Sequence, residues 1–197
     1  MQVENHKEEV PFAFYQERFA QADKAEILSR LPGVAAEDGF ALTLLGTTYR
    51  ITYPDAKITP ACPLPVQTFL LRYLLEGKAV AWQGGWKTFR EMPWGELYIK
   101  PYTGRVLTRA AFTFSTWVDA FRAACEKMGA TPLSHGDAGY QLNFLGDYNL
   151  QIMVWEGDDE FPPNAQVLYS DNFETGFAPE DRVVAGDILI STIKSFM

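Results

Sequence analysis

Several kinds of residue are scarce in this sequence, and each scarcity excludes a class of protein. There are 2 cysteines, far apart and in unlike surroundings, so we expect no disulfide framework and a cytoplasmic protein. No apolar run approaches the ~18 residues that a membrane-spanning helix needs, and the polar first residues lack the apolar segment of a secretory signal. Basic residues form no cluster and the net charge is −8, which argues against binding to nucleic acids or anionic membranes.

Groups that could act in catalysis are scarce as well. The run Ser134-His135-Gly136-Asp137 does not predict a catalytic triad, because triad members converge from separate elements. Cys125 lies on an apolar helix face, and Cys62 has no histidine nearby in the sequence, so neither is favoured as a nucleophile. The residue types alone therefore leave open whether the protein is an enzyme.

The rest of the composition is that of an ordinary globular protein. Hydrophobic residues make up 47% and charged residues 21%, which suits a chain that buries a core. Aromatic residues make up 14%, so we expect a core rich in rings. A length of 197 residues suits one compact domain or two small, closely fused halves, and we predict a single domain over residues 1–197.

Two segments share one pattern, and both predict a β-hairpin. Residues 39–53 and 139–154 follow the frame Gly, aromatic, any residue, Leu, any residue, apolar, Leu, Gly, with apolar residues alternating on both sides of the turn. Each segment follows a helical pattern and precedes a helix that begins with proline, Pro65 or Pro179. We therefore predict an α+β fold made of a duplicated helix–β-hairpin–helix unit, with an antiparallel sheet packed against helices. The repeats would cover about residues 14–80 and 115–193, joined by an aromatic and glycine-rich connection at 82–114.

Three further segments have patterns that predict their conformation. Residues 1–11 are expected to form an arm outside the fold. Residues 66–75 predict a mostly buried helix, which follows Pro65 and ends before Gly77. Tyr98 and Ile99 are assigned to a short strand.

The strongest concentration of one chemistry is the run Trp155-Glu156-Gly157-Asp158-Asp159-Glu160-Phe161-Pro162-Pro163. Four carboxylates within five positions repel one another, so water, a cation or backbone N–H groups must offset that repulsion. The order of apolar, acidic and again apolar residues predicts that Trp155 and Phe161 are largely buried. An exposed acidic loop would then lie between them.

Three interpretations of this acidic loop stay open. As a metal site, Asp158, Asp159 and Glu160, with Glu156 beside them, offer the oxygen ligands that Ca²⁺ or Mg²⁺ prefers, although the spacing of a calcium loop is absent. As a simple turn, an aspartate would accept hydrogen bonds from backbone N–H groups. If the loop is instead a binding surface for a partner, its carboxylates and Trp155 would contact another molecule. A divalent cation is the one cofactor that these residues suggest.

A second candidate site combines aromatic and basic residues. Trp86, Lys87 and Arg90 follow a glycine pair and, together with Trp82, could bind an anion or a flat ring. The alternative is a loop that its own tryptophans hold in place. The glycine pair lacks the spacing of either phosphate-binding motif.

Several of these segments together resemble a known family. The most specific is Val154-Trp155-Glu156-Gly157-Asp158-Asp159-Glu160-Phe161-Pro162, and residues 70–75, 85–93 and 179–181 support it. Over residues 14–193 the chain resembles the bacterial and archaeal family catalogued as domain of unknown function 3786. The resemblance implies no established activity. Some relatives look like fusions to a small iron–sulfur domain, which implies a link to anaerobic redox or corrinoid metabolism. This chain itself has no Cys-x-x-Cys, and two isolated cysteines cannot hold a four-iron cluster.

Three functions follow from these observations. The first is an accessory domain that binds a small molecule or a protein at the acidic loop or at the Trp86–Arg90 segment. The second is a metal-dependent enzyme that uses residues 156–160. The third is a structural module that forms a homodimer. Because no histidine, cysteine or serine constellation converges, the first is favoured over the second.

Overall fold

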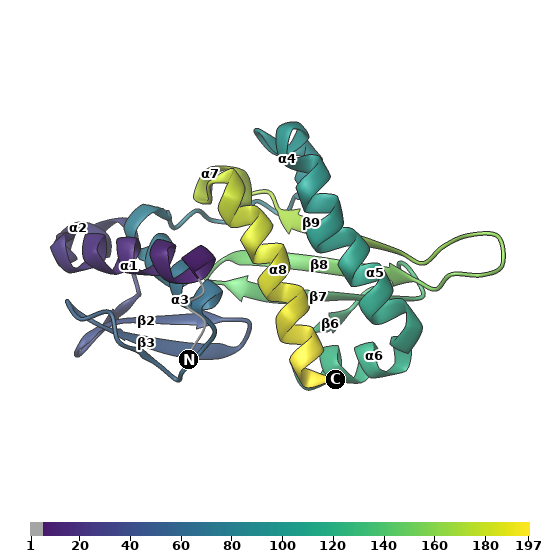
Figure 1. Ribbon diagram of the computed structural model, residues 1–197, viewed down its shortest axis with the longest axis horizontal. Coiled ribbons are helices and arrows are strands. Elements are labelled where there is room, and N and C mark those ends of the chain that lie inside the picture. The colour runs from purple at the N-terminus through teal and green to yellow at the C-terminus, as the bar shows by residue number, and fades with distance from the viewer. Residues whose placement is uncertain (1–5) are drawn as a thin grey trace. The chain divides into compact units, whose positions relative to one another are not determined.

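The computed structural model describes residues 6–197, and the chain forms two compact units, Met1–Ala79 and Val80–Met197 (Figure 1). In each unit helices accompany antiparallel strands, so the predicted α+β class is confirmed. No helix among the described residues is both long enough and apolar enough to cross a membrane. The first five residues of the expected arm lie outside the described residues. Residues 6–11 belong to a helix, so an arm of that length is wrong.

The first unit has two helices, a small antiparallel sheet and a third helix. Its elements in chain order are α1 His6–Gln21, α2 Lys24–Arg30, β1 Ala35–Ala36, β2 Gly39–Leu44, β3 Thr47–Thr52, β4 Ile58–Thr59 and α3 Leu64–Glu76. Strand β2 pairs with β1 and β3, and β3 also pairs with β4. The helix predicted after Pro65 is confirmed, and its end at Gly77 also agrees.

The hairpin of the first unit forms as the sequence predicts. Leu44 pairs with Thr47, which leaves Leu45 and Gly46 as a two-residue turn. Both turn residues have positive φ, 46° and 82°, which is the backbone that matches the twist of paired strands. Glycine adopts this conformation without steric cost, so Gly46 explains why the chain reverses here.

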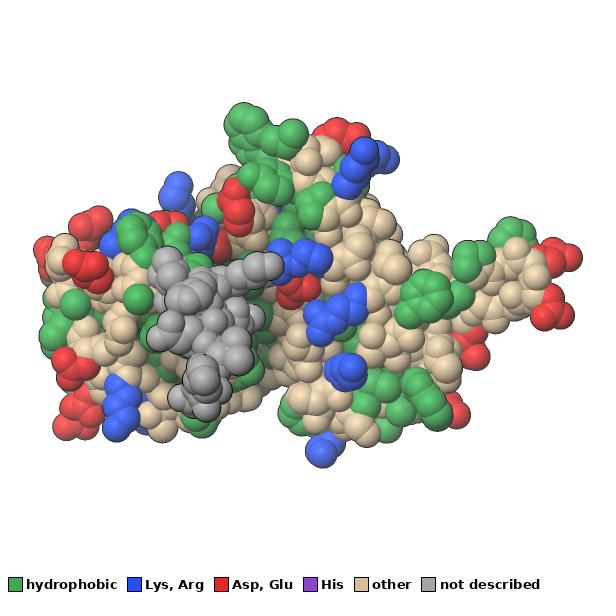
Figure 2. Space-filling view, viewed as in Figure 1, with side chains coloured by type: hydrophobic (Ala, Val, Ile, Leu, Met, Phe, Trp, Pro, Cys, Tyr) green, Lys and Arg blue, Asp and Glu red, His purple; other side chains and the backbone are tan. Residues whose placement is uncertain are grey.

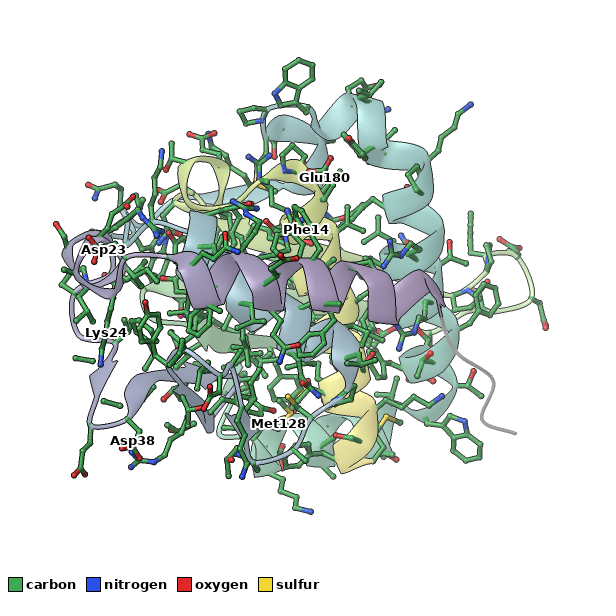
Figure 3. The ribbon with its side chains drawn as sticks, turned by 60° about the vertical axis from the view of Figure 1, so that its left-hand side comes forward. Phe14, Asp23, Lys24, Asp38, Met128 and Glu180 are labelled. Atoms are coloured by element: carbon green, nitrogen blue, oxygen red, sulfur yellow. The ribbon has the colours of Figure 1, made fainter. Side chains whose placement is uncertain are left out.

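Rings and helix caps hold the first unit together. Phe19 of α1, Phe40 of β2 and Tyr53 pack edge to face, with ring centroids 5.7 to 6.3 Å apart. Asp23 begins α2 because its Oδ1 accepts a hydrogen bond from the backbone N–H of Ala25 at 2.8 Å. Figure 3 labels Asp23 and the next residue, Lys24, on the same side of the first unit.

The second unit is built on a longer antiparallel sheet with the strand order β6-β7-β8-β9-β5. Its strands are β5 Trp86–Thr88, β6 Thr131–Pro132, β7 Ala138–Leu145, β8 Tyr148–Trp155 and β9 Asn164–Ser170. Its helices are η1 Phe89–Glu91, α4 Gly95–Tyr102, η2 Thr103–Thr108, α5 Arg109–Phe114, η3 Ser115–Trp117, α6 Val118–Lys127, α7 Phe173–Gly176 and α8 Pro179–Phe196. Helices α5 and α8 lie across the same face of the long strands (Figure 1).

The second hairpin also forms, with one residue more than the first. Tyr140 pairs with Ile152 as Phe40 pairs with Ile51, but a bulge between Asn143 and Leu145 absorbs the additional residue. Strand β9 follows this hairpin and pairs with β8 before the helix that begins at Pro179. The two hairpins are therefore confirmed, whereas their origin by duplication stays a prediction.

The segment 82–114, expected to be a connection, contains regular structure. It includes strand β5 and an almost unbroken helical run from Gly95 to Phe114. The assignment of Tyr98 and Ile99 to a strand is wrong, because both lie in α4. The helical period is visible in Tyr102, Val106, Ala110 and Phe114, which are spaced four apart and are all buried.

Helix α8 packs closely against the helical run and is anchored by a buried arginine. A Cβ at Gly186 would lie 2.9 Å from Val106 and from the Tyr169 hydroxyl, so only glycine allows this approach. Arg182 is 2% exposed and donates hydrogen bonds to several backbone carbonyl oxygens. They belong to Pro93, Phe173, Glu174 and Phe177. Arg182 thus joins α8 to α7 and to the segment before α4.

Candidate functional site

The acidic loop, residues 156–163, connects β8 to β9 and projects from the sheet of the second unit (Figure 1). Its tip is a turn that Asp158 holds: Oδ1 accepts hydrogen bonds from the backbone N–H groups of Glu160 at 2.8 Å and Phe161 at 2.7 Å. The N–H of Asp158 in turn donates to the carbonyl oxygen of Phe161 at 2.9 Å. This is the arrangement that the turn interpretation predicts.

The two aromatic residues that flank the carboxylates differ in exposure. Trp155, the last residue of β8, is half-buried. Phe161 is 67% exposed, so its predicted burial is wrong. The reason is that Asp158 and Phe161 pair at the tip of the turn, which places the Phe161 ring beyond the end of the sheet, out of reach of the core. Figure 2 shows hydrophobic and acidic side chains together on this projecting loop.

The carboxylates of the loop do not converge. Glu156, Asp158, Asp159 and Glu160 are all exposed, and one oxygen of Asp158 is already occupied by two N–H groups. Among residues 6–197 there is no group of three or more His, Cys, Asp or Glu side chains that could hold a metal ion.

The second candidate set lies at the other end of β9. Trp86 pairs with Ser170, the last residue of β9, whereas Trp155 pairs with Asn164, the first. Asn164 and Ser170 are six positions apart along β9, which corresponds to roughly 20 Å. The structure therefore keeps the Trp86–Arg90 segment and the acidic loop apart.

Both cations of the Trp86–Arg90 segment are paired. Lys87 Nζ lies 2.5 Å from a carboxylate oxygen of Glu174. Arg90 binds Glu96 through two hydrogen bonds, of 2.7 and 3.2 Å. These partners occupy the positive charges that an anionic ligand would need.

The glycine pair that precedes Trp86 is held from within the unit. Asp171 accepts hydrogen bonds from the N–H of Gly85 at 2.8 Å and of Gln83 at 3.1 Å. The ring centroids of Trp82 and Trp86 are 5.0 Å apart, and the Trp82 indole donates to the carbonyl oxygen of Gly85. The geometry is that of a loop held by its own tryptophans.

The cysteines are poor nucleophiles in this fold. Burial raises the pKa of the Cys62 thiol to about 11. Burial, together with the nearby Glu126 carboxylate, raises the pKa of Cys125 to about 12. Both therefore remain thiols near neutral pH.

The structure reveals a concave surface that the sequence patterns did not indicate. The helix-end pocket, as we call it, is an open cavity of about 530 Å³ where the α5–η3–α6 bend meets the end of α8. It is lined by Phe112, Thr113, Trp117, Ala120, Lys194 and Met197. This volume lies within the range of about 300–1,000 Å³ that is typical of ligand pockets.

The walls of the helix-end pocket are the outward faces of helices whose opposite faces pack into the core. Phe114 and Phe121 point inward, with ring centroids 4.9 Å apart, and Ile193 of α8 is fully buried. Phe112 and Trp117 consequently face outward and are 62% and 66% exposed. Figure 2 shows hydrophobic side chains exposed over α5 and α6. Exposed aromatic residues gathered on rigid helices are typical of a binding surface.

The pocket contains one positive side chain. Lys194 lies in its lining. Lys194 makes no ion pair within the described part of the chain. The lining contains no Asp or Glu side chain, and Asp119 of α6 is not part of it. An apolar group that carries negative charge would therefore fit best.

The helical period could have indicated the pocket. In a helix through residues 106–121 the inward positions include 106, 110, 114 and 121, so Phe112 and Trp117 fall outside the buried face. That deduction requires residues 103–114 to be helical. The glycine and proline residues around Tyr98 disfavour a helix, so the sequence does not indicate one there.

Comparison with known proteins gives one finding about the family and none about function. The family model described as "Domain of unknown function (DUF3786)" matches residues 23–192. No curated protein matches the chain, and no solved structure does.

Proposed function

We propose that this chain, which belongs to the family catalogued as domain of unknown function 3786, is a non-catalytic binding domain whose ligand enters the helix-end pocket. The observation that supports this most is the exposure of Phe112 and Trp117, 62% and 66%, in the lining of one cavity. Covering such surface on binding contributes roughly 25 cal/mol for each Å² of apolar area removed from water.

The charge of the pocket specifies the kind of ligand. Lys194 lines the pocket with the two rings and makes no ion pair with any residue from 6 to 197, so a ligand group with both a ring and a carboxylate satisfies both features. A segment of protein with an aromatic side chain next to Asp or Glu has this chemistry. The same pocket would disfavour a cationic segment.

The remaining interpretations are less well supported. A metal-dependent enzyme would need converging ligands, and residues 6–197 contain no group of three or more His, Cys, Asp or Glu side chains that could hold a metal ion. Binding at the Trp86–Arg90 segment would need Lys87 and Arg90 to release their carboxylate partners. The link to redox or corrinoid metabolism stays a prediction.

Nuclear magnetic resonance with short peptides tests the proposal. The protein labelled with ¹⁵N is titrated with acetyl-Glu-Phe-Glu-amide, and the indole N–H signals of Trp117 and Trp94 are followed. We expect the Trp117 signal to move and the Trp94 signal to stay. Acetyl-Lys-Phe-Lys-amide and acetyl-Glu-Ala-Glu-amide are the controls for charge and for the ring.

The variant Lys194→Glu sharpens this test. It replaces an attraction worth up to ~1 kcal/mol with a repulsion of similar size, so the affinity for the acidic peptide should fall about tenfold or more. The proposal is wrong if millimolar acidic peptide leaves the Trp117 signal in place, or if Lys194→Glu binds it as well as the wild type.

A further inference from the structure

We propose that the occupant of the helix-end pocket is the acidic loop, residues 156–163, of a second copy of this chain. This inference rests on the proposed function, because it names the partner of that pocket. The contact would place Phe161 of one copy between Phe112 and Trp117 of the other. The loop carboxylates would then lie beside Lys194.

The acidic loop has the chemistry that the pocket selects. Phe161 is 67% exposed, and Glu160 and Asp159 immediately precede it. Neither carboxylate has a hydrogen bond or an ion pair among the described residues. The loop is thus a negative segment with an exposed ring, and the pocket offers two exposed aromatic rings and a lysine that makes no ion pair with the described residues.

The loop is already folded in the form that it would present. The two N–H bonds to Asp158 and the bond from its own N–H to Phe161 fix the turn. Gly157 lies so close to Pro163 that a Cβ would stand 2.7 Å from the proline nitrogen. Since little conformational freedom remains to be lost, docking this segment costs less entropy than docking a flexible one.

The acidic loop does not occupy the helix-end pocket of its own chain. Both belong to the second unit, and there Phe161 and Trp117 remain 67% and 66% exposed. In Figure 1 the loop projects away from α6 and from the end of α8. Their mutual burial therefore requires two molecules.

The second unit has another pair of exposed apolar side chains, which fits the pocket less well. Trp94 and Leu97, at the start of α4, are 69% and 71% exposed. Their charged neighbours Arg90 and Glu96 neutralise each other. This pair lacks the negative charge that Lys194 would attract, so charge complementarity favours the acidic loop.

A two-fold axis allows each copy to give one loop and to receive one, which closes the assembly as a dimer. Each contact is small compared with a standard interface of about 1,600 Å², so we expect weak association. The dimer should appear at protein concentrations on the order of 100 µM and dissociate on dilution, as transient contacts of low area do.

Sedimentation velocity tests the contact with two variants that remove exposed rings. Phe161→Ala and Trp117→Ala should each sediment as monomers at ~100 µM, where the wild type forms dimers. Both side chains are more than 60% exposed, so the fold should persist, and far-ultraviolet circular dichroism checks this. Trp94→Ala is the matched control, because it removes an equally exposed ring from the same unit and should leave the dimer intact.

Two further experiments show whether the dimer depends on this particular contact: mixing the two ring variants, and exchanging the charges of the loop and the pocket. An equimolar mixture of Phe161→Ala and Trp117→Ala retains one intact loop and one intact pocket, so it should dimerise where each variant alone does not. Lys194→Glu should dissociate the dimer, and adding Glu160→Lys should restore it. Glu37→Lys in place of Glu160→Lys controls for the change in net charge, since Glu37 is exposed in the first unit, and should restore nothing.

The outcomes separate this inference from the proposed function. A monomeric wild type that still binds acetyl-Glu-Phe-Glu-amide at Trp117 overturns the second copy as partner and leaves the binding pocket standing. A dimer that Trp94→Ala disrupts and Phe161→Ala does not also overturns it. Loss of dimer in both ring variants, with recovery on mixing, supports the contact.

Discussion

Replacing the buried arginine of α8 should destabilise the second unit by an amount that the structure allows us to estimate. Arg182 is 2% exposed, and its guanidinium donates to four backbone carbonyl oxygens at distances of 2.7 to 3.3 Å. Burial lowers the pKa of Arg182, while Glu174 and other neighbours act in the opposite direction. The guanidinium nevertheless stays charged at neutral pH.

Arg182→Met keeps much of the side-chain volume and removes every donor. The carbonyl of Phe173 also accepts the N–H of Phe177, so it keeps a partner. The bonds from Arg182 to Pro93, Glu174 and Phe177 disappear. An acceptor that loses its partner costs about 1–3 kcal/mol, and the lower value applies to the two partly exposed bonds. We therefore expect the free energy of unfolding to fall by about 3–5 kcal/mol.

Urea unfolding followed by tryptophan fluorescence measures this loss. All five tryptophans lie at positions 82–155, so the signal reports on the second unit. Arg182→Lys should give an intermediate loss, because an ammonium keeps the charge but not the planar fork of donors. Arg90→Met is the control, since it removes an exposed ion pair of little value. A loss of less than about 1 kcal/mol in Arg182→Met would refute the reasoning.

Three further predictions concern the other groups discussed above. Cys62 should react slowly with a disulfide reagent at pH 8, and its rate should rise about tenfold per pH unit up to its pKa of about 11. Cys125 should stay unreactive until urea is added. Rapid labelling at pH 7 would contradict this. Because the Cys62 pKa lies above its ordinary value of 9.0, that thiol's contribution to stability is complete below pH 9 and declines as the pH rises towards 11. Asp171→Ala should lower unfolding stability by about 1–2 kcal/mol and shift the Trp86 emission to longer wavelength, since two N–H groups lose their acceptor; unchanged urea midpoints would count against this role. Millimolar Ca²⁺ or Mg²⁺ should leave the melting temperature equal to that in sodium chloride of matched ionic strength, and a rise that Asp158→Asn with Glu160→Gln abolishes would support the metal site instead.

The parts of the fold that local rules govern were predictable from the sequence. The alternation of apolar residues around Gly46 and Gly146 predicts both hairpins, and the proline at the start of α3 predicts that helix. The Asp158 turn also follows from a short side chain that can bond nearby N–H groups. Each of these features depends on residues that are close together in the chain.

The parts that depend on distant residues were not predictable in the same way. Phe161 was expected in the core, but burial depends on where the turn places the ring relative to the sheet. Residues 95–114 contain Gly and Pro that favour loops, yet packing of Tyr102 and Val106 against β9 and α8 stabilises a helix there. The helix-end pocket brings Trp117 together with Lys194, 77 positions later, and no spacing in the sequence indicates that pairing.

Photochemical cross-linking from the tip of the acidic loop tests the central claim most directly. Phe161→p-benzoylphenylalanine places a reactive group where we expect a ring to enter the pocket of a second copy. The protein is irradiated at ~100 µM, a concentration at which we expect a dimer with a small contact to form. Mass spectrometry should then find cross-links between two chains that join position 161 to the segment 112–117 or to Lys194. Cross-links confined to one chain, or directed to Trp94 and Leu97 of the second copy, would contradict the account.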